Sequence, residues 1–204
     1  MFNPAYRIIT PRLLIRCYNP TDAGMLADAV TESLDHLLPW MPWAAAEPEP
    51  FSMKVERLRR MRSSFDLNIN YIYGIFNLEN TRLLGGTGLH PRLGAGALEI
   101  GYWIHKDFIN QGYATETSAA LTRVAFEINK VNRVEIHHSV KNIRSAAVPR
   151  KLGFTCEATL RERSFANGQP SDQMIWSLFS EDFPKSPSAK QACAAFDAAE
   201  RSLL

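Results

Sequence analysis

The residues best placed to do chemistry form the run Ile109-Asn110-Gln111-Gly112-Tyr113-Ala114-Thr115-Glu116. This run joins a strand-like segment, residues 97–105, to a helix-like segment, residues 114–129, through a glycine turn. The first N–H groups of a helix have no partner within the helix, and the helix dipole favours negative charge there. The turn is therefore predicted to bind a pyrophosphate group through backbone N–H groups. The residues of this cradle are Gln111, Gly112, Tyr113, Ala114 and Thr115.

A second unit follows directly along the chain. Residues 133–140 have the pattern of a strand, and they precede the segment KNIRSAAVPRKLGF, residues 141–154. The order of strand, QGYATE turn, helix, strand and this segment resembles the GNAT superfamily of acetyl-CoA-dependent N-acetyltransferases. Thr10 to Arg16 (TPRLLIR), EIGYWI and GYATE are similar to the RimJ/RimL-like branch, which acetylates N-terminal residues of ribosomal proteins. The resemblance extends from about residue 6 to residue 180.

The resemblance implies an α/β (α+β) fold. We expect a central mixed, mostly antiparallel twisted sheet of about seven strands, flanked by helices and splayed between the fourth and fifth strands. Those two strands are residues 97–105 and 133–140. The resemblance also implies acetyl-CoA as cosubstrate and direct attack by an amine in a ternary complex. Such a reaction needs an unprotonated amine, an oxyanion stabiliser and a proton for the leaving thiolate.

The resemblance implies that the edge of the fourth strand pairs with the pantetheine arm. The residues concerned are Ile100, Tyr102, Trp103 and Ile104. Gly101 stands where a bulge would open the splay. A backbone N–H near Trp103 or Ile104 would stabilise the oxyanion. Ile109 and Asn110 depart from the common family pattern, which has Arg or Gln and then Gly, although a cradle of backbone N–H groups tolerates both.

Asn142 and Ser145 lie three residues apart at the start of an expected helix. Their family counterparts contact the pantetheine and the thioester sulfur, so Ser145 is the candidate general acid or its water-relay partner. Asn142 fits equally well as an N-cap. Pro149 lies inside the same helix and has no N–H for the carbonyl of Ser145, which predicts a kink there.

Glu99 is the leading candidate base, because it lies on the strand beside the expected thioester. It fits equally well as a structural acceptor for an arginine or a backbone N–H. Glu162 is the reserve, two residues before Ser164 and expected on the same strand face. His90 either points into the acceptor cleft or is an ordinary strand histidine. The histidines have no metal-ligand spacing, so no metal is predicted.

The acceptor is expected to meet Trp40 and Trp43, which lie in a proline-rich loop over residues 37–50. These tryptophans are either core anchors or an aromatic wall for the substrate. An α-amine has a pKa of about 8 and a lysine amine one of about 10.4. A weak or water-mediated base therefore suits an N-terminal amine, in agreement with the resemblance.

The remaining elements follow from periodicity and turn residues. Ser52 is expected to cap the second helix, and Asn167-Gly168 to turn the last hairpin. Glycines at residues 85–88 and 94–96 are expected to be bends, turns or close backbone approaches rather than a phosphate loop. The expected helices are residues 23–32 and 52–65, and the other expected strands are residues 12–18, 71–77, 82–90, 154–165 and 171–179.

The chain of 204 residues is predicted to form one domain over residues 1–183 and a weakly helical or flexible tail over residues 184–204. A net charge of +2 without a basic arm disfavours nucleic-acid binding. Three cysteines without metal-ligand spacing favour a reducing compartment, the cytoplasm, and no apolar run suits a membrane. A small-molecule N-acetyltransferase and a non-catalytic CoA sensor remain alternatives. The protein is expected to be a monomer or a homodimer.

Overall fold

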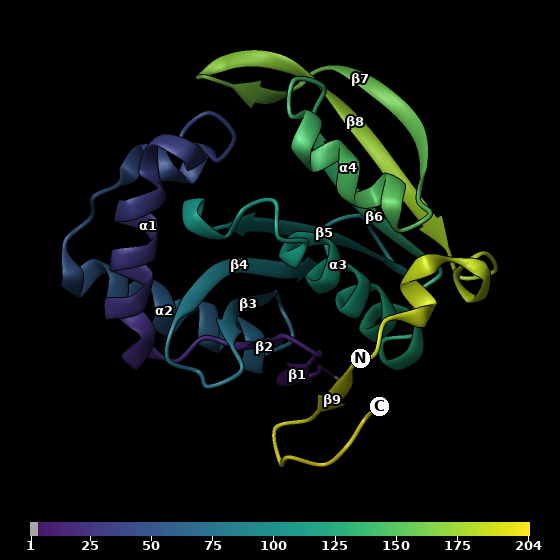
Figure 1. Ribbon diagram of the computed structural model, residues 1–204, viewed down its shortest axis with the longest axis horizontal. Coiled ribbons are helices and arrows are strands. Elements are labelled where there is room, and N and C mark those ends of the chain that lie inside the picture. The colour runs from purple at the N-terminus through teal and green to yellow at the C-terminus, as the bar shows by residue number, and fades with distance from the viewer. Residues whose placement is uncertain (1–3) are drawn as a thin grey trace.

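The computed structural model describes residues 4–204. Within this range nine strands form one sheet in the order β7-β8-β6-β5-β4-β3-β2-β1-β9 (Figure 1). Only β5 and β6 pair in parallel among these strands. The strands are β1 (Arg7–Ile9), β2 (Leu13–Cys17), β3 (Tyr71–Asn77), β4 (Leu83–His90), β5 (Ala97–Ile104), β6 (Arg133–Ser139), β7 (Thr155–Ala166), β8 (Gln169–Phe179) and β9 (Ala194–Phe196). The predicted mixed, mostly antiparallel sheet is confirmed, with two more strands than expected. β1 and β9 have three residues each, too few to show a periodic pattern.

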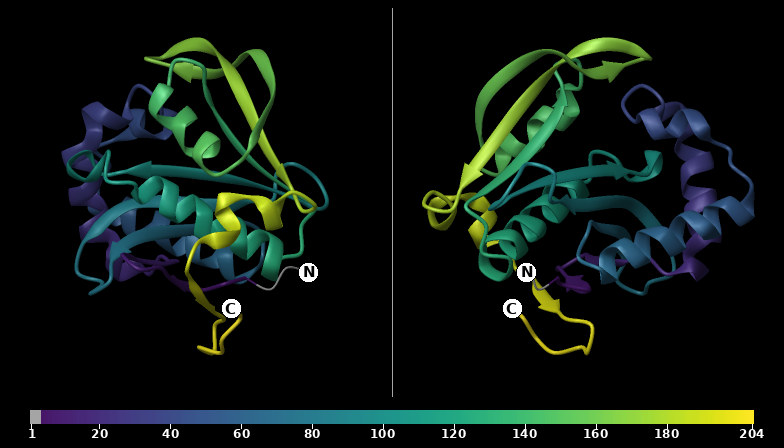
Figure 2. Two further views of the ribbon diagram at one scale, coloured as in Figure 1. Left: turned by 45° about the vertical axis from the view of Figure 1, so that its right-hand side comes forward. Right: turned by 180° about the vertical axis from the view of Figure 1, so that it is seen from behind.

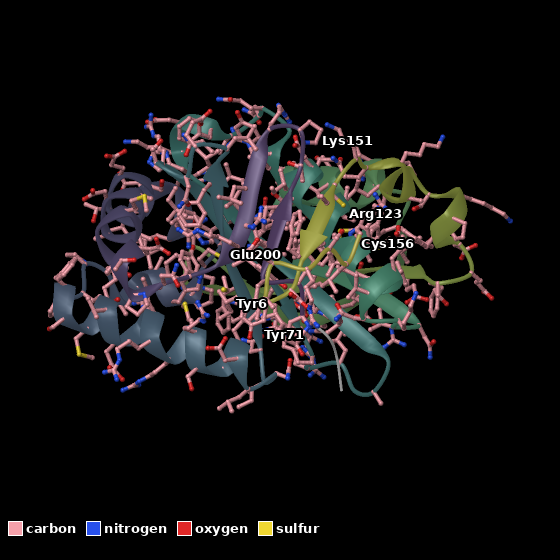
Figure 3. The ribbon with its side chains drawn as sticks, turned by 90° about the horizontal axis from the view of Figure 1, so that it is seen from below. Tyr6, Tyr71, Arg123, Lys151, Cys156 and Glu200 are labelled. Atoms are coloured by element: carbon pink, nitrogen blue, oxygen red, sulfur yellow. The ribbon has the colours of Figure 1, made fainter. Side chains whose placement is uncertain are left out.

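Four α-helices of residues 4–204 flank the sheet. They are α1 (Ala23–Leu37), α2 (Phe51–Asp66), α3 (Tyr113–Arg123), which continues into a π-helical turn at Val124–Ile128, and α4 (Ile143–Lys151). α3 lies in front of the sheet in Figure 1, and α2 lies on the opposite face, as the reversed view in Figure 2 shows. Phe65 anchors α2, because its ring meets Tyr6 and Tyr71 at centroid distances of 4.9 and 5.4 Å; Figure 3 labels both tyrosines.

Two helix ends differ from the prediction. α1 extends to Leu37 instead of ending near Glu32, because its buried face continues through Val30 to Leu37. α2 begins at Phe51, with Pro50 in the N-cap position and no side-chain cap among the described residues. The predicted Ser52 cap was therefore wrong. The extension of α1 matters most, since it carries one more turn of side chains towards the site.

The predicted splay is confirmed between β5 and β6, the fourth and fifth expected strands. Their pairing covers Ala97 to Glu99 on β5 and ends there, while β6 continues along β8. The expected bulge at Gly101 is absent from the described β4–β5 ladder, in which Gly101 lies opposite Gly88 without a register shift. β5 simply stays with β4 where β6 turns away. Gly101 instead leaves room for His90, whose Nε2 would lie 3.3 Å from an added Cβ.

The glycines of β4 permit close approach to β5, as predicted. A Cβ at Gly85 would lie 2.2 Å from the carbonyl oxygen of Trp103. A Cβ at Gly86 would lie 2.5 Å from Nε1 of the same tryptophan. A side chain at residue 85 would therefore require the β5 backbone to move, and one at residue 86 would require the Trp103 ring to move. The two glycines thus leave room for the backbone and the ring of Trp103.

The C-terminal segment, expected to be a weakly helical or flexible tail, contains short 3-10 helical turns at Phe183–Lys185 and Pro187–Lys190, followed by β9. β9 pairs with β1, and Tyr6 N–H donates to the carbonyl of Phe196 at 2.8 Å. Arg123 of α3, labelled in Figure 3, donates to the carbonyl of Gln191 at 2.8 Å. The edge strand β1 supplies backbone hydrogen-bond partners for β9. The Ala-rich sequence of the segment gave no sign of this pairing. Over residues 4–204, no helix combines the length and apolar character needed to cross a membrane.

Candidate active site

A pocket of about 570 Å³ opens where β5 and β6 separate. It lies between the end of α1, the open edge of β5, the start of α3 and the start of α4. Its lining comprises His36, Leu37, Trp40, Met41, Tyr102–Ile104, Phe108–Asn110, Gly112–Thr115, Lys141–Ser145, Ala147, Val148 and Lys151. Most of the predicted cofactor-binding residues therefore surround one space.

The start of α3 has the backbone geometry of an anion cradle. Gly112 is left-handed at φ 83°, and the N–H of Glu116 makes the first helical bond to its carbonyl at 3.0 Å. Asn110 is also left-handed at φ 61°, a conformation that asparagine tolerates better than most residues. This tolerance explains how Asn110 adopts a backbone conformation that usually favours glycine. The N–H groups of residues 113–115 precede the first helical bond and border the pocket.

Gln111 differs from the other predicted cradle residues because it lies outside the described lining. Its carbonyl accepts from Arg12 Nη1 at 3.0 Å, and its side-chain Nε2 donates to the carbonyl of Asp107 at 3.1 Å. Both groups are thus used to fix the turn. Of the predicted cradle, residues 112–115 line the pocket and Gln111 does not.

The cradle is held from below by the turn between β1 and β2. One oxygen of Glu116 accepts from Thr10 Oγ1 at 2.6 Å and from the Arg12 N–H at 3.2 Å, and the other accepts from Arg12 Nε at 2.6 Å. The Arg12 guanidinium also lies 4.6 Å from the ring centre of Tyr113. The sequence motifs TPRLLIR and GYATE are therefore one structural unit, joined by contacts that span about half of the chain.

The pocket has a cationic lining. Lys141, Arg144 and Lys151 all border it from the α4 side, in addition to the positive end of the α3 dipole. His36 borders the same space from α1, and burial, followed by Arg144 and His105, lowers its pKa below the usual value. Sequence reasoning missed His36 because the predicted helix stopped at Glu32. The apolar spacing from Val30 to Leu37 was the available signal.

Ser145 borders the pocket at the start of α4. Its N–H donates to Asn142 Oδ1 at 3.1 Å, so the N-cap alternative for Asn142 is observed, although Asn142 also borders the pocket. α4 is helical from Ile143 to Lys151, with Pro149 inside it. The Tyr102 hydroxyl lies 3.1 Å from the carbonyl oxygen of Ser145 and 3.0 Å from its Oγ.

Glu99 lies outside the described lining and is buried against an arginine. Arg92 Nε donates to it at 2.7 Å, the Arg92 Nη2 closes the ion pair, and His137 Nδ1 lies 3.6 Å away. Burial by itself raises the pKa of Glu99, but Arg92, His137 and His90 together lower it below the usual value. This environment matches the structural-acceptor alternative better than that of a proton acceptor.

His90 and Glu162 also lie outside the described lining. His90 Nδ1 is 2.8 Å from Asn70 Oδ1, and burial and Arg92, opposed by Glu99, lower its pKa to about 4. Glu162 is exposed and left-handed at φ 51° within an irregular part of β7. The irregularity breaks the strict alternation of side chains on which the expected shared face with Ser164 depended.

The two tryptophans have different positions. Trp40 borders the pocket, whereas Trp43 is 37% exposed and packs against Trp103 with ring centroids 6.1 Å apart. The tip of the β7–β8 hairpin reaches the same loop, where Asn167 N–H donates to the carbonyl of Pro39 at 2.9 Å. Figures 1 and 2 show this hairpin arching towards the loop after α1.

One described group has metal-ligand character. Glu32, His105 and Asp107 offer atoms within 4.8 Å of one another. His105 Nε2 lies 2.9 Å from Glu32 Oε2, and its Nδ1 accepts from the Asp107 N–H at 3.2 Å. Both ring nitrogens thus have protein partners, and the group links α1 to the turn after β5.

The chain belongs to the GNAT acetyltransferase family. The family described as acetyltransferase (GNAT) domain matches residues 12–155. The chain is therefore an N-acetyltransferase.

Named relatives refine the comparison. The chain is 30% identical to the "Putative ribosomal N-acetyltransferase YdaF" of Bacillus subtilis over 86% of this chain and 95% of the relative. It is 24% identical to the [ribosomal protein uS5]-alanine N-acetyltransferase of Escherichia coli over 88% of this chain and 94% of that protein. The solved structure of Mycobacterium smegmatis RimJ in complex with CoA-disulfide matches with a TM-score of 0.78 at 20% identity and covers 91% of both chains.

Proposed function

We propose that the protein transfers the acetyl group of acetyl-CoA to the α-amine at the N-terminus of a protein, in a ternary complex. The observation that carries the proposal is one pocket whose lining includes the start of α3, nearby cationic side chains, the open edge of β5 and Ser145. The pocket has room and charge for a phosphate-bearing cosubstrate with a long thioester arm. Acetyl-CoA would supply the activated acyl group.

The residues of the chain divide the remaining tasks. The N–H groups of residues 112–115 and the cations Lys141, Arg144 and Lys151 would bind the phosphates. The β5 edge from Tyr102 to Ile104 would pair with the pantetheine, and an N–H at Trp103 or Ile104 would donate to the oxyanion. Ser145 would donate the proton that the departing thiolate needs.

His36 is the proton acceptor best placed in this pocket. Its lowered pKa favours the neutral imidazole, in which one ring nitrogen can accept a proton. Proton transfer from an α-ammonium of pKa about 8 to a given base is roughly 250-fold more favourable than transfer from a lysine ammonium of pKa about 10.4. This comparison favours an N-terminal acceptor. The names of two relatives, which refer to ribosomal-protein acetylation, support the same choice.

Thiol release from acetyl-CoA tests the proposal directly. The panel contains peptides with N-terminal Ala, Ser or Met, their N-terminally blocked forms carrying a lysine, polyamines and aminoglycosides. We expect release with one class of free N-terminal peptide and loss of at least tenfold in kcat for Ser145→Ala. Ser52→Ala, an exposed serine on α2, is the matched control. Release only with polyamines or aminoglycosides would establish the small-molecule alternative, and CoA binding without release would support a sensor.

The choice of base is tested by three matched variants. We expect His36→Gln to lower kcat/KM for the peptide at neutral pH and to remove the acidic limb of its pH profile. Glu99→Gln and Glu162→Gln should retain that limb. Loss of the limb in Glu99→Gln, with the protein still folded, would restore Glu99 as the base.

A further inference from the structure

Ser145 is held at each of its polar atoms. Its N–H donates to Asn142 Oδ1 at 3.1 Å, and its carbonyl oxygen and Oγ both lie within hydrogen-bond distance of the Tyr102 hydroxyl. Tyr102 belongs to β5 and Ser145 to α4, so this contact crosses the space where β5 and β6 separate. It ties the predicted proton donor to the strand that borders the cosubstrate pocket.

Pro149 explains why the carbonyl of Ser145 needs an outside donor. In an α-helix the carbonyl of residue 145 accepts from the N–H of residue 149, and proline has no N–H. This carbonyl is partly buried, and an acceptor shielded from water without a donor is costly. The Tyr102 hydroxyl, at 3.1 Å, takes the place of the absent helical donor. Burial, partly offset by the Ser145 contact, raises the pKa of Tyr102 above its usual range, so the hydroxyl keeps its proton.

We propose that Tyr102 is a positioning residue that fixes the side chain of Ser145 for proton donation. The single phenolic proton goes to the Ser145 carbonyl, so the phenolic oxygen accepts from Ser145 Oγ–H. This arrangement fixes the position of Oγ at the pocket wall. Rotation about the Cβ–Oγ bond then turns the serine proton towards the pocket without moving a heavy atom. The role rests on the proposed function of Ser145 as proton donor.

A double-mutant cycle tests the structural half of the inference. Tyr102→Phe, Pro149→Ala and the double variant are unfolded in urea. We expect Tyr102→Phe to lower the ratio of folded to unfolded protein about tenfold, or about 1.4 kcal/mol. In the Pro149→Ala background the loss should shrink to about threefold or less, because the new N–H can serve the Ser145 carbonyl. Equal losses in both backgrounds would overturn the inference.

Tyr18→Phe is the matched control for this cycle. Tyr18 is buried, and its hydroxyl has no hydrogen-bond partner among the described residues. Removing that hydroxyl should change the folding ratio by less than about threefold in either background, since no hydrogen bond is lost. The cycle needs no acceptor amine, so it remains informative even if the proposed acceptor is wrong.

A second cycle, in turnover, tests the positioning role. Tyr102→Phe should lower kcat about tenfold and change KM for acetyl-CoA by less than about threefold. In the Ser145→Ala background the same replacement should lower kcat by less than about twofold, because nothing remains to be positioned. An undiminished loss of kcat in that background would show that Tyr102 acts independently of Ser145, and a change confined to KM would show that it only binds the cosubstrate. Either result would overturn the positioning role.

Discussion

Glu116→Gln separates a structural role for this carboxylate from an electrostatic one. The carboxylate lies one turn into α3, beside a cradle proposed to bind phosphates. Electrostatics by itself predicts tighter CoA binding when a negative charge leaves, by about 1 kcal/mol for partly solvated groups. The observed contacts predict the opposite result, because Glu116 is the group that connects the cradle to Thr10 and Arg12.

The magnitude follows from counting donors. One oxygen of Glu116 accepts from Thr10 Oγ1 at 2.6 Å and from the Arg12 N–H at 3.2 Å. The other oxygen lies 2.6 Å from both Nε and Nη2 of Arg12. Glutamine has one acceptor oxygen, so its NH₂ group must face one of these donor pairs. Loss of two such bonds from a nearly buried group should lower the free energy of unfolding by about 3 kcal/mol. We expect Kd for CoA to rise about tenfold, or about 1.4 kcal/mol, as the turn loosens.

Isothermal titration with CoA and urea unfolding measure the two effects separately. Glu127→Gln is the matched control, because it breaks an ion pair with Arg123 further along the same helical segment, where both partners are partly exposed. Its effect on stability should stay below about 1 kcal/mol, and CoA binding should be unchanged. Tighter CoA binding by Glu116→Gln would refute the structural reasoning and show that charge dominates at the cradle.

Three further predictions concern the surrounding framework. The pKa of His90 falls from its ordinary value near 6.5 to about 4 in the fold, so between these pH values the unfolded chain binds a proton that the folded chain does not, and stability falls as pH falls. Urea unfolding at pH 7 and pH 4 should show a loss of stability about 3 kcal/mol greater in the wild type than in His90→Gln. Equal losses in the two proteins would contradict the assignment. Gly85→Ala should lower the midpoint of thermal unfolding by more than 5 °C, because its Cβ meets a Trp103 backbone atom at 2.2 Å, whereas Gly94→Ser, in open space although left-handed, should cost less. Replacing Trp40 with Ala should raise KM for the acceptor and leave CoA binding intact; equal loss of both would indicate a structural anchor.

Local sequence patterns were sufficient to predict the regular strands and the final hairpin. Alternation located the strands that became β3, β4 and β5, and Asn167-Gly168 located the final hairpin. Short or irregular elements lacked such a signal. β9 depends on the free edge of β1 rather than on its own sequence, and the irregular part of β7 breaks the alternation that had placed Glu162 beside Ser164.

Neighbouring residues and their spacing were enough to predict the turn at the start of α3, and the resemblance of the motifs to the GNAT family predicted the family and the splayed sheet. Which side chains share the pocket depends on how the elements pack in three dimensions. In the folded chain Glu99 forms an ion pair with Arg92, His36 borders the pocket from the end of α1, and the Tyr102 hydroxyl contacts Ser145. Such contacts join residues far apart in the chain, and their geometry arises only when the sheet, the helices and the turns pack together.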